Sequence, residues 1–295
     1  MNISLTDRAV AAGFAAGWKL VPLLPQRLTA RGFELAADRV WRGRGASVRR
    51  LEANLARVTG LEGAELRELT RRGMRSYFRY FHEVFRLPKM PSAEVVRRTH
   101  VTGDEHIWQT LESGRGVVLA LPHMGNWDQA GAWLVGNGRR FTTVAERLKP
   151  ESLYRRYTAF REGLGMEVLP LTGGAGHTIG TLASRVRRGG VVCLPAERDL
   201  TKSGIEVSFF GATTKVPAGP ALLAVQTGCA LLPAILWFEG DDWGLRIEPE
   251  VAVPAEGTRQ ERVAVAAQRL VEVFEKGIAE HPEDWHMLQR LWIDQ

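Results

Sequence analysis

The hydrophobic pattern of the chain changes near residue 100. Before it, apolar residues recur at three- and four-residue spacing, which predicts helices over residues 3–20 and throughout 26–88. After it, short apolar runs alternate with helical stretches, as in a mainly parallel sheet. We expect the strands at 117–121, 142–146, 167–171, 191–195, 230–237 and 244–250. We expect the helices at 126–136, 150–163, 177–188, 217–227 and 259–280.

This order of elements predicts an α/β fold, with a mainly parallel central sheet flanked by helices and a helical N-terminal section. A chain of 295 residues is long enough to bury a sizeable core. We expect one domain over 1–295, in which 1–100 forms the helical section and 101–295 the α/β core.

The helical section leaves two questions open. The first helix carries Phe14 and Trp18 and is amphipathic, so it could lie in a membrane interface or pack on the body of the protein. Farther along, an aromatic stripe over 74–85 is more typical of core than of a cofactor site. The opposite face carries a row of arginines, which is either solvated or close to anionic lipid headgroups. These are Arg71, Arg72, Arg75 and Arg79.

Composition narrows the partners. The net charge is +6, which suits anionic partners such as phospholipid surfaces or phosphorylated cofactors, although a GC-rich genome that prefers Arg would produce the same bias. No nucleic-acid-binding motif is present, so we expect no nucleic acid partner. Cys193 and Cys229 lie in apolar runs and are expected to be buried thiols in a reducing compartment, not a disulfide or a metal site. Without a secretory signal or a membrane-spanning run, we expect a cytoplasmic protein that is soluble or peripheral.

The stretch with the clearest chemistry is GVVLALPHMGNWDQAG, residues 116–131. It predicts a buried strand, a turn, and a helix that opens at Asn126 with Gln129 in the position of a capping box. His123 and Asp128 would diverge by roughly 140° on one continuous helix, so they can meet only if His123 precedes the helix. A neutral His held by a carboxylate is a general base, and the helix N-terminus beside it could hold a developing oxyanion. The alternative is that both residues merely cap local structure.

Further charges follow the expected strands. Glu146 ends the strand at 142–146, Glu197 and Arg198 follow the strand at 191–195, and Arg161 lies on the helix at 150–163. Each could be an ordinary surface charge, but together with His123 they would gather at one edge of the sheet. The pair Phe209-Phe210 before a glycine could wall an apolar slot or simply pack in the core.

The 116–131 stretch contains the His-x4-Asp box of glycerolipid-type acyltransferases, and its HMGNWD form resembles the branch that includes the lipid A biosynthesis acyltransferases. Further matches are FREGLG, FFGATTKVPAGPALLA and HPEDWHMLQRLW, at 160–165, 209–224 and 281–292. Within that branch the chain looks most like the actinobacterial enzymes that acylate phosphatidylinositol mannosides, because of VAERLKPESLY and LPAERDL at 144–154 and 194–200. Glu-Arg-Asp follows the 191–195 strand where the lipid A enzymes would have Asp-Gln, and the Pro-Glu-Gly box of the wider group is absent.

This resemblance implies transfer of a palmitoyl chain from acyl-CoA to the 6-hydroxyl of the mannose on the inositol 2-position of mannosylated phosphatidylinositol. It places the enzyme peripherally on the cytoplasmic, inner face of the plasma membrane. It makes His123 the base and Asp128 its partner, and it assigns Glu146, Arg161, Glu197 and Arg198 to substrate binding. The thioester is already activated, so no metal, cofactor or covalent intermediate is expected. The alternatives are a lipid A-type acyltransferase and an acyl-CoA or lipid hydrolase using the same pair.

Overall fold

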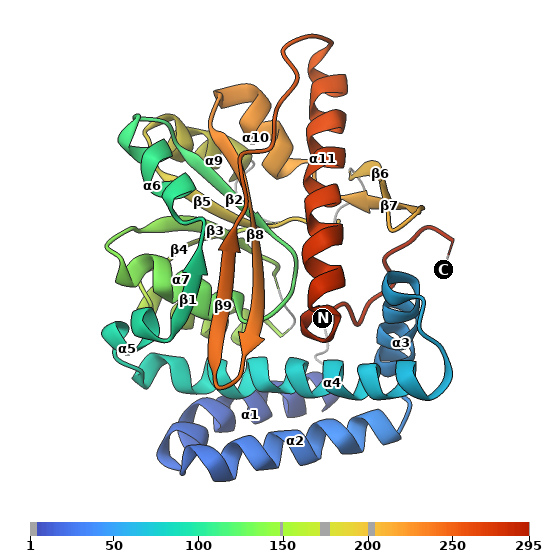
Figure 1. Cartoon of the computed structure of the whole chain (residues 1–295). Coiled ribbons are helices and arrows are strands. Elements are labelled where there is room, and N and C mark those ends of the chain that lie inside the picture. Colours follow the sequence, from blue (N-terminus) through green and yellow to red (C-terminus); the bar gives the residue numbers. More distant parts are fainter. Residues whose placement is uncertain (1–4, 148–149, 172–177, 200–203, 295) are drawn as a thin grey trace.

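The computed structural model describes residues 5–147, 150–171, 178–199 and 204–294 (Figure 1). The N-terminal section is helical, as predicted. Glycine-containing turns divide the helical residues of 26–88 into separate helices, and Gly60 ends one of them with a positive φ of 69°. The helices of this section are α1 Leu5–Leu20, α2 Gln26–Arg42, α3 Ala46–Thr59, α4 Gly63–Arg86 and α5 Ser92–Arg97. Short 3-10 turns occupy Val21–Leu23 and Leu87–Lys89.

A mostly parallel sheet of seven strands forms the centre of the protein, in the order β1-β9-β8-β2-β5-β3-β4. Its strands are β1 Thr99–Thr102, β2 Val117–Leu121, β3 Phe141–Ala145, β4 Glu167–Pro170, β5 Val191–Pro195, β8 Ala230–Glu239 and β9 Asp242–Ile247. Among the described strand pairs of this sheet, β8 and β9 are antiparallel and the others are parallel. All five residues of β2 are buried, because β2 lies between β8 and β5 and helices cover both faces. The predicted fold class is confirmed.

Apart from a short helix at Glu105–Glu112, which was not predicted, the helices of the α/β part lie close to their predicted positions. They are α6 Glu105–Glu112, α7 Trp127–Gly136, α8 Glu151–Gly163, α9 Thr178–Arg187, α10 Gly219–Thr227 and α11 Arg259–Glu280, followed by a 3-10 turn at Pro282–Asp284. The helix α11 begins and ends at the predicted residues, since a capping box of Thr258 and Glu261 fixes its start. It packs beside α10 and against β8.

Three strands were not predicted. The edge strand β1 is short, and the hairpin of β6 Ile205–Phe209 and β7 Ala212–Val216 stands apart from the main sheet (Figure 1). The sequence indicated only a turn at Phe209-Phe210. In the structure Phe209 is fully buried and contacts Trp285 and Trp292, so this aromatic pair packs in the core.

The helix α4 runs across the end of the sheet where β2 and β8 finish (Figure 1). The first helix packs on it, because Phe14 contacts Phe81 and Phe85, and Trp18 contacts Phe85. The aromatic face of α1 therefore packs on the body of the protein, while Lys19 and Leu20 at its end are exposed. None of the described helices is long and apolar enough to cross a bilayer.

The arginine row of α4 is largely engaged within the protein. Arg71 and Arg75 both make two hydrogen bonds to the carboxylate of Asp38 on α2, which is nearly inaccessible to solvent. These bonds hold the pKa of Asp38 far below its ordinary value. Arg79 pairs with Glu83 and donates to two carbonyls of the β8–β9 turn. These three arginines therefore join α4 to its neighbours and are not a solvated row.

Candidate active site

The loop between β2 and α7 carries His123. As predicted, His123 precedes the helix, and the Asn126 side chain caps α7 by accepting a hydrogen bond from the Gln129 amide at 3.0 Å. The reciprocal half of the expected capping box is absent, because the Gln129 side chain donates to Thr99. Gly125 has a φ of +56°, and a Cβ there would come within 2.9 Å of the Leu236 backbone. The loop is therefore held tightly against β8.

His123 pairs with Glu197. The ring nitrogen Nδ1 lies 2.8 and 3.0 Å from the two Glu197 oxygens, and the His123 backbone amide donates to the same carboxylate at 2.6 Å. Because an ionised carboxylate can only accept, Nδ1 carries a proton, and in the neutral form of the ring Nε2 has the free lone pair. Glu197 is fully buried, whereas 25% of the His123 side chain is exposed. The imidazole thus has one nitrogen fixed and the ring within reach of a substrate.

The pKa of Glu197 follows from two opposing effects. Burial acts to raise the pKa of this carboxyl, but the charge of His123 and its hydrogen bonds outweigh burial and lower the pKa below its ordinary value. The carboxylate is therefore ionised at neutral pH. It can stabilise an imidazolium if His123 takes up a proton.

Asp128, the expected partner of His123, contacts a different group. Its carboxylate receives two hydrogen bonds from Arg161, at 2.6 and 3.3 Å, and a third from the Tyr80 hydroxyl at 2.8 Å. Asp128 lies on the first turn of α7 and points toward α4 and α8, whereas the His123 ring points toward the end of β5. The predicted His123–Asp128 contact is therefore wrong in this structure, and Glu197 occupies that place.

This Asp128 ion pair is deeply buried. Asp128 is 1% exposed, and the charge of Asp128 keeps the pKa of Arg161 above its ordinary value although burial acts to lower it. Burial, and then the charge of Asp128, raise the pKa of Tyr80 well above its ordinary value, so Tyr80 stays a neutral donor. The Trp127 ring joins the two pairs, because it stacks on Tyr80 and meets the His123 ring edge-to-face.

The remaining predicted residues are less closely connected. Arg198 is half-buried and acts on Tyr77, where its charge opposes the rise in pKa that burial causes. Glu146 is exposed just beyond β3, and in the described part of the chain no hydrogen bond ties it to His123 or Asp128. The sequence did not single out Tyr80 as more than core, because its role depends on where α4 crosses the sheet.

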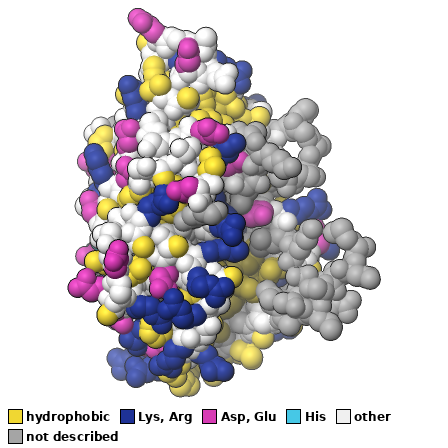
Figure 2. All heavy atoms as spheres, turned by 90° about the vertical axis from the view of Figure 1, so that its right-hand side faces the viewer, with side chains coloured by type: hydrophobic (Ala, Val, Ile, Leu, Met, Phe, Trp, Pro, Cys, Tyr) yellow, Lys and Arg dark blue, Asp and Glu magenta, His cyan; other side chains and the backbone are white. Residues whose placement is uncertain are grey.

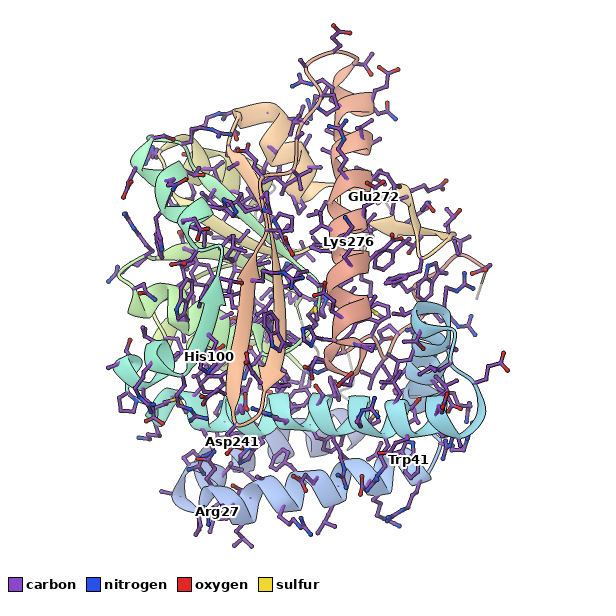
Figure 3. All side chains as sticks on the ribbon, in the orientation of Figure 1. Arg27, Trp41, His100, Asp241, Glu272 and Lys276 are labelled. Atoms are coloured by element: carbon purple, nitrogen blue, oxygen red, sulfur yellow. The ribbon has the colours of Figure 1, made fainter. Side chains whose placement is uncertain are left out.

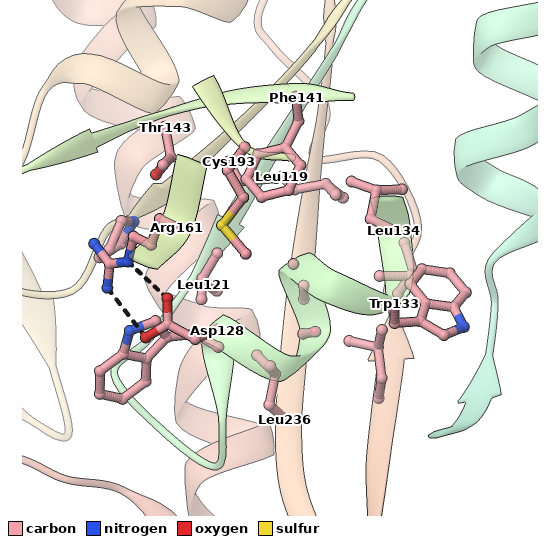
Figure 4. A pocket seen from close by; sticks show the side chains of 18 of the residues that line it. Leu119, Leu121, Asp128, Trp133, Leu134, Phe141, Thr143, Arg161, Cys193 and Leu236 are labelled. Carbon is pink, nitrogen blue, oxygen red and sulfur yellow. Dashed lines mark hydrogen bonds and ion pairs between the residues drawn. The ribbon is translucent and has the colours of Figure 1, made fainter. Parts of the chain in front are cut away.

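An apolar cavity lies beside the loop (Figure 4). Its lining residues come mostly from α7 and from the strands β2, β3, β5, β8 and β9. Leu121 and Trp127, which flank His123 in the sequence, both line it. Figure 4 shows the Asp128–Arg161 pair at one side and apolar side chains over the rest of the wall. These include Leu119, Leu134, Phe141, Cys193 and Leu236. Both cysteines are free thiols.

Comparison with known proteins shows the family of the chain. A family model described as bacterial lipid A biosynthesis acyltransferase matches residues 3–294. The chain belongs to this acyltransferase family. The chain is 49% identical to a protein of Mycolicibacterium smegmatis named phosphatidylinositol mannoside acyltransferase, over 99% of this chain and 94% of that protein. A protein of Mycobacterium tuberculosis with the same name is 47% identical, over 98% and 90% of the two chains.

Proposed function

We propose that this acyltransferase moves a long-chain acyl group, palmitoyl, from acyl-CoA to the 6-hydroxyl of the mannose on the inositol 2-position of phosphatidylinositol mannosides. The observation that carries the proposal is the reachable imidazole of His123, held by Glu197 beside an apolar cavity. The names of the two relatives support the acceptor. The family supports acyl transfer.

The reaction needs a base for the sugar hydroxyl. Nε2 of His123 takes the hydroxyl proton while the oxygen attacks the thioester carbon, and Glu197 stabilises the imidazolium through Nδ1. The C–O bond forms, the C–S bond breaks, and the imidazolium returns its proton to the leaving thiolate. The N-terminus of α7 favours the negative charge that develops on the thioester oxygen. No atom of the protein becomes acylated.

We place the acyl chain of the donor at the apolar cavity, because its wall is almost entirely apolar. Each buried CH₂ contributes about 0.8 kcal/mol to affinity, so contact of a long acyl chain with apolar side chains would strengthen donor binding considerably. The Arg161–Asp128 pair lies at the side of the cavity, where a long hydrocarbon would end in its polar thioester. Arg198 and Glu146, near the ends of β5 and β3, remain proposed contacts to the lipid phosphate and the sugar hydroxyls.

A peripheral position on the inner face of the plasma membrane is supported by the outer side of α1 and α2. Exposed leucines and exposed basic residues alternate there, a combination that suits an anionic lipid interface. We call this the α1–α2 surface: it comprises Lys19, Leu20, Leu23, Leu24, Arg27, Leu28, Arg31, Leu35, Arg39, Val40 and Arg42. Figure 2 shows Lys and Arg gathered at this lower end, and Arg27 projects away from the sheet (Figure 3).

The membrane proposal is tested with vesicles of phosphatidylcholine, with and without phosphatidylinositol. The double variant Leu28→Glu/Leu35→Glu should lose at least tenfold in vesicle affinity, because it places two charges where apolar side chains enter the interface. Val265→Glu is the matched control, since Val265 is similarly exposed but lies on α11. Equal binding by all three proteins would reject this surface.

The substrate proposal is tested by giving the purified enzyme palmitoyl-CoA with either a phosphatidylinositol mannoside or a lipid A precursor. We expect transfer to the mannoside alone. Turnover only on the lipid A precursor, or thioester hydrolysis without transfer, would replace the proposal by one of its two rivals. Palmitoyl bound to an acyl carrier protein serves as the second donor, and a preference for it would reject acyl-CoA.

The base is tested with His123→Ala, which should abolish transfer and leave binding of palmitoyl-CoA within about threefold. His100→Ala is the matched control, because His100 is an exposed histidine of β1 that pairs with Asp242 (Figure 3). Transfer retained by His123→Ala would remove His123 from the mechanism.

A further inference from the structure

The C-terminal tail, which we define as residues 281–294, forms a short antiparallel pairing with the loop that carries His123. The His286 amide donates to the His123 carbonyl and the Gly125 amide donates to the Asp284 carbonyl, both at 2.8 Å. Between them, Met124 and Trp285 form a β-bridge. Three consecutive residues of the loop are thus bound through their backbone to a segment about 160 residues away in the sequence.

The tail is fixed in turn by Ser76 on α4. The Ser76 hydroxyl lies 2.6 Å from an Asp284 oxygen and 2.8 Å from Nε2 of His286. The second Asp284 oxygen accepts the Phe238 amide of β8 at 2.8 Å. One hydroxyl therefore joins the two tail residues whose backbones hold the loop, and Asp284 connects them to the sheet.

These groups are buried among rings and have little freedom. Ser76, Asp284 and His286 are each less than a tenth exposed. The His286 ring lies against Tyr77, Tyr80 and Trp127. Burial, and then the charge of His123, lower the pKa of His286 to about 3, so it remains neutral. A neutral ring in this position cannot act as a second cation beside the base.

The direction of the hydrogen bonds follows from donor and acceptor count. An ionised Asp284 accepts from the Ser76 hydroxyl, so Nε2 of His286 must donate to the Ser76 oxygen. Each of the three side chains then has one defined role in the chain of bonds. Removal of the central hydroxyl would leave two buried polar atoms without partners, which costs about 1–3 kcal/mol and favours a shift of the tail.

We infer that Ser76, Asp284 and His286 are positioning residues. They hold the backbone of the His123 loop in the position from which Nε2 of His123 can reach the acceptor hydroxyl. The inference rests on the proposed function only for the identity of that hydroxyl. The side chains act through the tail backbone, and none of the three lines the apolar cavity, so donor binding depends on other groups. A misplacement of about 1 Å in such a loop costs about 100-fold in rate.

The test compares Ser76→Ala with Thr70→Val. Both variants remove one buried hydroxyl from α4, but the Thr70 hydroxyl bonds only within the helix, to the Leu66 carbonyl. We expect Ser76→Ala to lower kcat by about 10- to 100-fold and to leave the KM for palmitoyl-CoA within about twofold. Thr70→Val should stay within about twofold in both. Equal kcat in the two variants, or a parallel change of kcat and KM, would overturn the inference.

A second pair of variants keeps the test decisive if Ser76→Ala folds poorly. Asp284→Asn can still accept the Phe238 amide and can donate to the Ser76 oxygen, while Asp284→Ala can do neither. We expect Asp284→Asn to recover most of the kcat that Asp284→Ala loses. Equally slow Asn and Ala variants would show that geometry is not what Asp284 supplies.

A third readout separates this inference from the proposed function. Modification of His123 by diethylpyrocarbonate, followed by peptide mass spectrometry, needs no acceptor. We expect its rate to change at least threefold in Ser76→Ala and not in Thr70→Val. If the wild-type enzyme fails on the mannoside but this rate still changes, the substrate is wrong and the positioning role stands; an unchanged rate removes the positioning role itself.

Discussion

Two regions at the carboxyl edge of the sheet each hold a buried carboxylate, and the two carboxylates have partners of different chemistry. At the end of β5, Glu197 faces an imidazole; at the start of α7, Asp128 faces a guanidinium and a phenol. Both are almost inaccessible to solvent, so neither can remain charged without its partner. The difference shows that the spacing of the two residues in the sequence does not decide which acid contacts the histidine. Lateral contacts between neighbouring strands and helices decide it.

The comparison is tested most severely at Glu197. Glu197→Gln removes the charge that stabilises the imidazolium and can force the other tautomer, so we expect kcat to fall by about 10²- to 10⁴-fold. The measurement is steady-state transfer beside the unfolding free energy. Glu250→Gln, which removes an exposed carboxylate paired with Arg115, is the control. A larger loss of kcat in Asp128→Asn than in Glu197→Gln, at equal stability, would restore Asp128 as the partner of His123.

At Asp128 the larger effect should be on folding. Asp128→Ala leaves Arg161 buried and unpaired, which we expect to lower the unfolding free energy by about 3–5 kcal/mol. Asp128→Leu combined with Arg161→Met replaces the ion pair by apolar groups and should recover most of that loss. Urea denaturation measures both. If Asp128→Ala is as stable as the wild type, the Arg161 guanidinium must be solvated or paired with another carboxylate in that variant.

A third buried carboxylate extends the comparison. The described hydrogen-bond partners of the Asp284 carboxylate are the Ser76 hydroxyl and the Phe238 amide, which are both neutral. Burial raises its pKa from 3.8 to about 6. Between these values the folded protein holds a proton that the unfolded chain has lost, so stability falls as the pH rises. At about 1.4 kcal/mol per pH unit, the titration of this carboxyl should lower the unfolding free energy by about 2 kcal/mol between pH 4.5 and 7.5. Asp284→Asn lacks this decline, and the difference between the two denaturation curves measures it.

If the wild type and Asp284→Asn depend on pH in parallel over this range, the carboxyl titrates no differently in the folded and unfolded states. The neutral partners of Asp284 would then not distinguish its titration from that of an ordinary carboxyl, and the contrast with Glu197 and Asp128 would fail. Denaturation by urea at fixed ionic strength keeps the contribution of the surface ion pairs comparable.

The sequence predicted those features that depend on local pattern. The run Val117–Leu121 and the helix Arg259–Glu280 lie where expected, since one is continuously apolar and the other has a strong period and a cap. The position of His123 before the helix also follows from local spacing. The contact with Glu197 could not be predicted in the same way, because it requires β5 to lie beside β2, and lateral strand order leaves no periodic signal.

The same reasoning explains the other misses. The strands β6 and β7 alternate buried and exposed residues, but each has only five residues and Phe210 adopts a positive φ at their turn, which hid the hairpin. The arginine row of α4 has the spacing of a solvated face, and only the packing of α2 shows that Asp38 lies opposite. Ser76 and Asp284, 208 residues apart, have no local signal that joins them.

The pairing of the C-terminal tail with the His123 loop also has a consequence for biosynthesis. The strands of the main sheet are complete once Ile247 has been made, whereas the segment that braces the loop is synthesised later. A nascent chain that has reached Glu280 can assemble its core while the imidazole is still unsupported. The loop would then acquire its final position only after the tail residues have emerged and paired with it.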